Sequence, residues 1–248
     1  MVKKMSEKMV LFKDGKRLDG RGPTDLRPLK ITAGVLARAS GSCLIEWGRN
    51  KVLAAVYGPR EVFPRHLTNP RKAIINARYI MAPFSSVEEH GRSGPNRRSI
   101  EISKVVKHVF ENVVFTERFP KMAIDVQMEV LQSDGGTRVS AINAAAVALA
   151  DAGIPMRDLV CGVAAGRVDG NLIIDLDKYE DNLGESDIPI IFSPRTKEVL
   201  LFQLDGVVSK QEISQVLDMA FESSLKVREK QIEALREKFD KIDSGDLQ

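Results

Sequence analysis

The chain has 248 residues, of which 43% are hydrophobic and 29% charged, and its formal net charge is +3. This composition is typical of a globular protein, and no apolar run approaches the ~20 residues that are needed to span a bilayer. Residues 1–8 lack the apolar core of a signal peptide, so we expect a cytoplasmic protein.

The first half of the chain predicts a hairpin, a strand and a helix. Residues 41–57 have the pattern of a β-hairpin that turns at residues 48–50. Residues 73–82 should form another strand, and residues 99–115 a helix. The apolar face of that helix would consist of Ile102, Val105, Val106, Val109, Phe110 and Val113.

The middle of the chain predicts a strand, a glycine turn and a helix. Residues 123–131 alternate between apolar and polar side chains, and residues 139–152 are rich in alanine. Between them, Gly135-Gly136-Thr137-Arg138 lets the backbone approach a ligand closely and adds a hydroxyl and a guanidinium. Free amides at a helix start suit a phosphate, although an ordinary turn with a surface arginine fits the same pattern.

The last third predicts a second hairpin, two strands and a long helix. The hairpin covers residues 160–175, and the strands lie near 188–193 and 199–204. The helix starts with a capping box at Ser209 and Glu212 and continues to about Phe239. Two hairpins that are each followed by further elements suggest an internal duplication.

Positive charge gathers in residues 60–98, which hold eight Lys and Arg against three acids, among several prolines and glycines. Basic loops bind polyanions, and nucleic acid is the first candidate, although charged surface loops are also common without such a role. Within this segment, Arg65 and His66 lie in a stiff loop between two prolines. Arg97 and Arg98 precede the predicted helix and are placed to grip phosphates.

Asp181 and Asp187 lie at the entrance to an apolar strand. A carboxylate there is costly to desolvate unless it is paired or binds a cation. Two converging carboxylates would suit Mg²⁺, whereas spacing alone favours a solvated acidic loop.

Five ordered blocks stand out along the chain. They are residues 18–22, 56–60, 97–102 and 133–138, and the pair Asp181 and Asp187. Together they resemble the signature blocks of the RNase PH-like 3′→5′ phosphorolytic exoribonucleases. The opening blocks and the Pro-Arg-His-Leu loop resemble most closely the catalytic RNase PH-like subunit of the archaeal exosome.

The resemblance implies an α+β fold with a duplicated unit, in which mixed sheets pack with helices. It implies one RNase PH-like domain with halves at about 10–155 and 156–240 and a frayed tail at 241–248. The implied enzyme uses inorganic phosphate as co-substrate to shorten single-stranded RNA from its 3′ end. It releases nucleoside diphosphates, and the reverse reaction adds 3′ tails.

The resemblance also assigns roles to individual residues. The phosphate-binding residues would be Gly136, Thr137, Arg138, Ser140 and Arg98. The RNA-binding residues would be Arg65, His66, Arg97 and Arg98. Asp181 and Asp187 would be catalytic and would hold Mg²⁺, or alternatively Mn²⁺, and Asp187 would also protonate the leaving 3′ oxygen.

The implied partners are an inactive RNase PH-like paralogue, which forms a hexameric ring of three heterodimers with this chain, and RNA-binding cap subunits. Three alternatives stay open. They are a non-catalytic RNA-binding ring subunit, a bacterial-type homohexameric enzyme that trims tRNA, and a hydrolytic Mg²⁺ nuclease. The last of these predicts nucleoside monophosphates as products.

Overall fold

Two five-stranded sheets organise the part of the chain that the structure, a computed structural model, describes, residues 10–86 and 96–243. The elements of the first half are β1 (Phe12–Lys13), β2 (Lys16–Arg17), β3 (Leu29–Ala33), β4 (Gly41–Trp47), β5 (Asn50–Glu61), η1 (Arg65–Leu67), β6 (Ile74–Met81), α1 (Arg97–Val113), η2 (Thr116–Arg118), β7 (Met122–Gln132) and α2 (Thr137–Asp151). Those of the second half are β8 (Cys161–Val168), β9 (Asn171–Ile174), α3 (Lys178–Leu183), β10 (Ser186–Ser193), β11 (Glu198–Phe202), β12 (Asp205–Gly206) and α4 (Lys210–Asp243).

The first sheet has the strand order β3-β4-β5-β7-β6, and only the β6–β7 pair is parallel among these described strands. β4 and β5 form the predicted hairpin, in which Trp47 faces Asn50 across the turn. Gly48 adopts a φ of 58° in this turn, a conformation that favours glycine. The hairpin therefore places Asn50 at one end of the sheet, next to the end of β7.

The second sheet has the order β11-β10-β8-β9, and β12 also pairs with β10. β8 and β9 are the second predicted hairpin, and all neighbours in this sheet are antiparallel. The short β12 brings Asp205 opposite Asp187 on β10. Both sheets and their helices confirm the expected α+β class.

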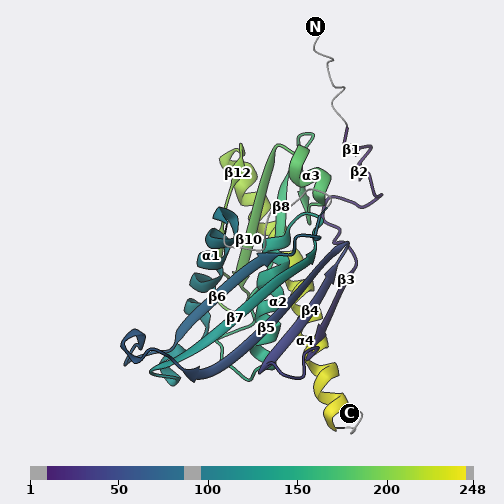
Figure 1. Cartoon of the computed structure of the whole chain (residues 1–248). Helices are drawn as coiled ribbons and strands as arrows, with labels where there is room; N and C mark the ends of the chain where they lie inside the picture. The colour runs from purple at the N-terminus through teal and green to yellow at the C-terminus, as the bar shows by residue number, and fades with distance from the viewer. Residues whose placement is uncertain (1–9, 87–95, 244–248) are drawn as a thin grey trace.

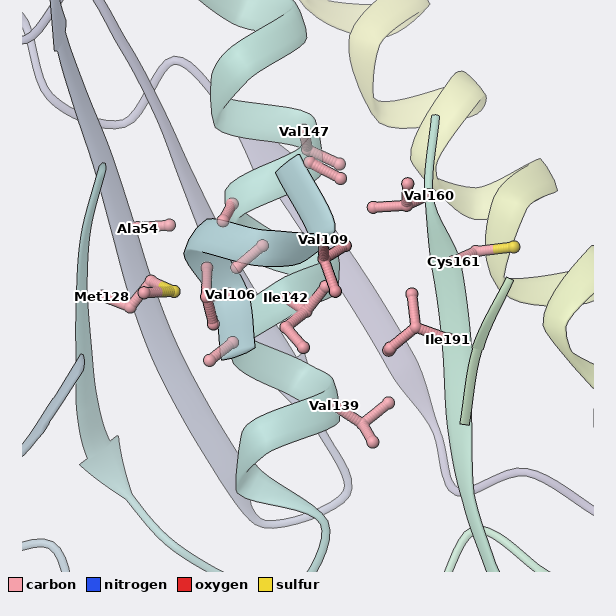
Figure 2. Packing of buried hydrophobic residues seen from close by; sticks show 14 of the residues in the cluster. Ala54, Val106, Val109, Met128, Val139, Ile142, Val147, Val160, Cys161 and Ile191 are labelled. Carbon is pink, nitrogen blue, oxygen red and sulfur yellow. The ribbon is translucent and has the colours of Figure 1, made fainter. Parts of the chain in front are cut away.

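The two sheets are separated by helices, which gives four layers (Figure 1). α1 and α2 pack between the sheets, and α4 covers the outer face of β8. Figure 2 shows Met128 of the first sheet and Ile191 of the second on opposite sides of Ile142 in α2. Because α2 meets a sheet on each side, it is apolar nearly all round, and its alanines let both sheets approach closely.

Two helices begin earlier than the sequence predicted. α1 starts at Arg97 instead of residue 99 because Asn96 is its N-cap, and the Asn96 side chain accepts a hydrogen bond from Ser99 N at 2.7 Å. α2 starts at Thr137 instead of residue 139, directly after Gly136 in the left-handed conformation. Both shifts bring functional candidates, Arg97 and Thr137, into the first turn of a helix.

α4 extends the predicted last helix to Asp243. The helix thus continues into the stretch expected to be a frayed tail, 241–248, of which residues 244–248 lie outside the described residues. The capping box is confirmed, since Ser209 N donates to Glu212 and Glu212 N to Ser209. No helix in the described part of the chain combines the length and apolar character that crossing a bilayer requires.

Four strands, β1 to β3 and β12, and the short helix α3 were not predicted. β1 and β2 have two residues each, too few for a periodic pattern. α3 has six residues, and its sequence is polar enough to suggest a loop. Part of the basic segment, residues 87–95 with Arg92, lies outside the described residues.

The close packing of α2 predicts that Gly41 tolerates no side chain. A Cβ at this position would lie 2.3 Å from Ala148 O and Ala152 N, which are backbone atoms of the α2 end and cannot move away cheaply. We expect Gly41→Ala to lower the free energy of unfolding by about 1–3 kcal/mol in urea denaturation. Arg38→Ala, at an exposed site nearby, should change it by less than about 0.5 kcal/mol. Equal stability of the two variants would contradict the packing argument.

Candidate active site

A polar cavity of about 420 Å³ opens where α2 begins, between α1, α3, β10 and β12. It brings together residues that are far apart in the sequence. Its lining residues are Arg98, Gly136, Thr137, Arg138, Ala164, Asp181, Asn182, Gly184, Glu185, Ser186, Asp187, Pro189, Asp205 and Gly206. The structure thus gathers two arginines, the glycine turn and both predicted aspartates in one place.

The glycine turn presents the start of α2 to this cavity. Gly135 and Gly136 both have positive φ, 71° and 65°, and a Cβ on Gly135 would lie 2.5 Å from the Asp177 carbonyl carbon. Gly136 is the N-cap of α2 and carries no side chain to cap it. The amides of the first turn and the positive end of the helix dipole therefore point toward the cavity, an arrangement that suits an anion.

Buried polar side chains hold the turn from below. Asn50 donates from its amide to Gly135 O and accepts from Asp134 N. The Arg27 guanidinium donates to Asp134 O and Gly135 O, and it pairs with Asp175 at 2.7 Å. Because Asn50 and Arg27 are 0% and 6% exposed, the turn is fixed by bonds that water cannot replace.

A second buried pair anchors α3, which carries Asp181. Arg17 donates through Nε to Glu180 at 2.7 Å and through Nη1 to the Ile174 carbonyl at 2.6 Å. Glu180 also closes the capping box of α3, because it accepts from Asp177 N at 2.9 Å. Arg17 thereby ties the N-terminal segment to the residue that precedes Asp181.

The two aspartates are partly buried, and burial raises the pKa of each carboxyl. Burial is the largest cause for Asp181, against the opposing attraction of Arg98 and Arg138. For Asp187, burial and the neighbouring charge of Asp181 raise the pKa to about 7. Near neutral pH, a large fraction of the Asp187 carboxyls therefore carries a proton that can be donated.

The same two carboxylates fit a divalent cation. In the described ranges, no group of three or more His, Cys, Asp or Glu residues is placed to hold a metal ion. Mg²⁺ is commonly held by one or two carboxylates together with substrate phosphates, so two suffice. A cation would also offset the cost that burial imposes on the charged forms of Asp181 and Asp187.

Arg138 of the cavity is positioned by neighbouring polar groups. Arg138 donates to the Gln203 side chain and lies 4.0 Å from Glu101, and Gln203 donates to Glu101 at 2.9 Å. Arg138, held by these side chains, is only 22% exposed. Below it, the buried Tyr79 hydroxyl donates to Thr137 Oγ1 at 2.9 Å.

Four predicted residues lie outside the cavity lining. Ser140 is 1% exposed, and its hydroxyl donates to Gly136 O within α2. Arg97 is exposed beside Arg98 at the start of α1. Arg65 and His66 are exposed on η1, in the loop between β5 and β6, which lies at the opposite end of the molecule from α3 and β12 (Figure 1).

Sequence reasoning missed several residues that shape the site: Arg17, Arg27, Asn50, Tyr79, Asn182, Gln203 and Asp205. Most of them support others and belong to no motif. Asn50 offered one signal, because it ends the predicted turn at residues 48–50 and is a polar residue at the start of an apolar strand.

Two family models match most of the chain. The model of domain 1 of a 3′ exoribonuclease family, RNase PH, matches residues 25–155, and the model of its domain 2 matches residues 158–223. The two matches together cover both sheets from β3 to β11 and contain every residue of the cavity lining.

Proteins that resemble the chain along its length are described as exosome complex component Rrp41. The protein of Pyrococcus abyssi is 51% identical over 98% of this chain and 97% of its own length. That of Archaeoglobus fulgidus is 52% identical over 94% and 90%.

Two solved structures resemble the fold. Rice Rrp46 has a TM-score of 0.79 at 27% identity, over 89% of this chain and 100% of that one. A chain of the Archaeoglobus fulgidus exosome with RNA bound to the active site has a TM-score of 0.76 at 25% identity, over 88% and 93%.

The support under the glycine turn predicts that Asn50 controls anion binding from outside the cavity. Asn50→Ala leaves Asp134 N and Gly135 O buried without these partners, at about 1–3 kcal/mol for each group. We expect weaker binding of inorganic phosphate by calorimetry and a lower free energy of unfolding. Asn112→Ala is the matched control, because the exposed Asn112 side chain donates to His108 O within its own helix. Unchanged phosphate affinity in Asn50→Ala would show that the turn does not depend on this clamp.

Proposed function

The chain belongs to the 3′ exoribonuclease family RNase PH, and on that premise we propose that it is the catalytic RNase PH-like subunit of an exosome. It is a phosphorolytic 3′→5′ exoribonuclease that shortens single-stranded RNA and releases nucleoside diphosphates. The same site adds 3′ tails in the reverse direction. The observation that carries the proposal is that the glycine turn, the two arginines and the carboxylate pair line one cavity.

The reaction brings two anions together, since an oxygen of inorganic phosphate attacks the terminal phosphodiester phosphorus. The bond from phosphorus to the 3′ oxygen breaks, the new phosphorus–oxygen bond completes a nucleoside diphosphate, and the leaving 3′ oxygen takes a proton. No protein nucleophile is required. What the protein must supply is positive charge, positioning and the proton.

The cavity offers each of these. The first-turn amides of α2 with Thr137 and Arg138 hold the attacking phosphate, and Arg98 grips it from α1 or holds the scissile group. Ser140 supports this turn from inside α2 by its bond to Gly136 O. Asp187 lies in the same cavity, and its pKa, which burial and Asp181 raise to about 7 without a bound cation, makes it the candidate to donate the proton to the leaving oxygen.

Asp181 and Asp187 would hold Mg²⁺, or Mn²⁺ in its place, and the ion would supply charge that offsets the repulsion between the two phosphate groups. The raised pKa values of both carboxyls support this assignment, because burial without a counter-ion disfavours their charged forms.

RNA contacts extend beyond the cavity. Arg97, exposed beside Arg98, is placed to bind the backbone just upstream of the cleaved linkage. Arg65 and His66, on the distant η1 loop, would line the route by which single strands enter a hexameric ring built with an inactive paralogue. RNA-binding cap subunits would complete this cytoplasmic assembly. Contacts of this kind are independent of sequence and weaken with salt.

The chain is 51% and 52% identical to two exosome components over nearly its whole length. This similarity favours the exosome assembly over a homohexameric tRNA-trimming enzyme. A ring subunit that only binds RNA would not need the arginines, the turn and both aspartates that meet in the cavity. A hydrolytic nuclease would have no use for a second anion site.

Replacement of Asp187 by asparagine tests its role as proton donor. Asp187→Asn keeps the shape of the side chain but removes the acid, so we expect the rate of phosphorolysis to fall about 10²- to 10⁴-fold. Asp218→Asn, at an exposed site on α4, should keep the wild-type rate. The rates are measured as nucleoside diphosphate release from single-stranded RNA with Mg²⁺ and inorganic phosphate, using the chain alone and with its paralogue.

A sulfur-bridged substrate separates the acid from a purely structural role. An RNA whose terminal linkage carries sulfur in place of the bridging 3′ oxygen needs no proton on its leaving group. On this RNA, Asp187→Asn should recover the part of its rate that the missing acid costs, but not the part that a lost cation ligand costs. A deficit of equal size on both substrates would contradict the role of Asp187 as acid. Wild-type activity without phosphate, with monophosphates as products, would overturn the proposed function itself.

A further inference from the structure

A groove of about 960 Å³ continues from the catalytic cavity along the outside of α3. We call it the aromatic groove, and its lining residues are Arg49, Phe84, Ser85, Ser86, Leu131, Gln132, Ser133, Asp134, Lys178, Tyr179, Asn182 and Leu183. A narrower hollow of about 80 Å³ joins the two, because it shares Arg98, Thr137 and Asp181 with the cavity and Ser86, Ser133 and Lys178 with the groove. Asn182 lines all three.

The groove carries exposed apolar side chains that nothing in the described fold covers. Phe84, just after β6, is 75% exposed, and Tyr179 and Leu183 of α3 are 55% and 54% exposed. Two aromatic rings from different elements, with a leucine beside them, form an apolar surface next to a strongly polar cavity. Such a surface usually marks a binding site.

The charged groups of the groove favour an anionic ligand. Arg49 at the β4–β5 turn and Lys178 at the start of α3 are its cations. Among the lining residues that the structure describes, Asp134 is the only acid, and it lies 3.5 Å from Arg27. A ligand that is anionic along its backbone and carries flat apolar groups fits both features, and single-stranded RNA has this chemistry.

We infer that the aromatic groove is a nucleobase subsite, which stacks a base near the 3′ end of single-stranded RNA on Tyr179 and Phe84. The inference rests on the proposed function, because it extends the path of the RNA that ends in the cavity. It gives this chain a contact with the bases in addition to its contacts with phosphates. Stacking accepts any base, so the subsite adds affinity without a sequence preference.

Tyr179 can be replaced without disturbing the helix that carries Asp181. Its backbone amide, and not its side chain, donates to Asp177 in the N-cap of α3. Tyr179→Ala therefore removes the ring and keeps the cap, and Tyr179→Trp keeps a ring in its place. Phe239→Ala, which removes a half-exposed ring at the far end of α4, is the matched control.

The experiment uses the full chain assembled with its paralogue and RNAs in which one of the last four nucleotides lacks its base. Binding is measured by fluorescence anisotropy in the absence of phosphate, and phosphorolysis is measured separately. We expect one abasic position to weaken wild-type binding about 5- to 100-fold. Tyr179→Ala and Phe84→Ala should bind intact RNA correspondingly more weakly and lose the penalty at that position. Tyr179→Trp and Phe239→Ala should behave like wild type.

Three outcomes would overturn the inference. The first is that Tyr179→Ala keeps the full abasic penalty at every position. The second is that Phe239→Ala loses as much affinity as Tyr179→Ala, and the third is that the groove variants fail to assemble with the paralogue. The last outcome would make the groove a protein interface. Absence of phosphate-dependent cleavage in wild type would refute the proposed function but not the subsite. The subsite is tested by binding affinity, through the effect of Tyr179→Ala on the abasic penalty.

Discussion

Buried bonds from Asn50 and Arg27 hold the 134–136 turn in place, and the other functional groups of the cavity are arranged around that turn. A site that brings phosphate to a phosphodiester must place positive charge before the reactants arrive, because rearrangement during the reaction would cost part of the stabilisation. The amides at the start of α2 provide such fixed charge only if the turn cannot relax. Two glycines allow this turn, and the buried bonds below make it rigid.

The turn is rigid because residues from both halves of the chain meet beside it. Asn50 comes from the first hairpin, and Asp175, which pairs with Arg27 and accepts from Trp47 Nε1 at 3.0 Å, follows the second. Asp187 lies at the start of a strand in the second sheet, while Arg98 lies at the start of a helix that packs on the first. Because α2 is buried between both sheets, a movement of either half would disturb the cavity.

Much of this arrangement was predictable from the sequence, because periodic patterns report burial. Both hairpins, the alanine-rich helix and the glycine turn at residues 135–136 follow from such patterns, and the structure brings the two aspartates into one cavity with Arg98 and Arg138. The supports were not predictable. Arg27 and Arg17 look like surface arginines in a polar segment, and only the folded chain shows that they are buried against Asp175 and Glu180. The pattern also gave no sign that the Ser140 hydroxyl would donate to Gly136 O at the start of its own helix.

The most direct test of the account follows the phosphorus atom itself. The chain, assembled with its paralogue, is given unlabelled single-stranded RNA, Mg²⁺ and ³²P-labelled inorganic phosphate, and the mononucleotide products are separated. The account predicts nucleoside diphosphates that carry the label only in the β-phosphate, because the added phosphate is the attacking group. Unlabelled nucleoside monophosphates would contradict it, since water would then be the attacking group and the turn at the start of α2 would serve another purpose.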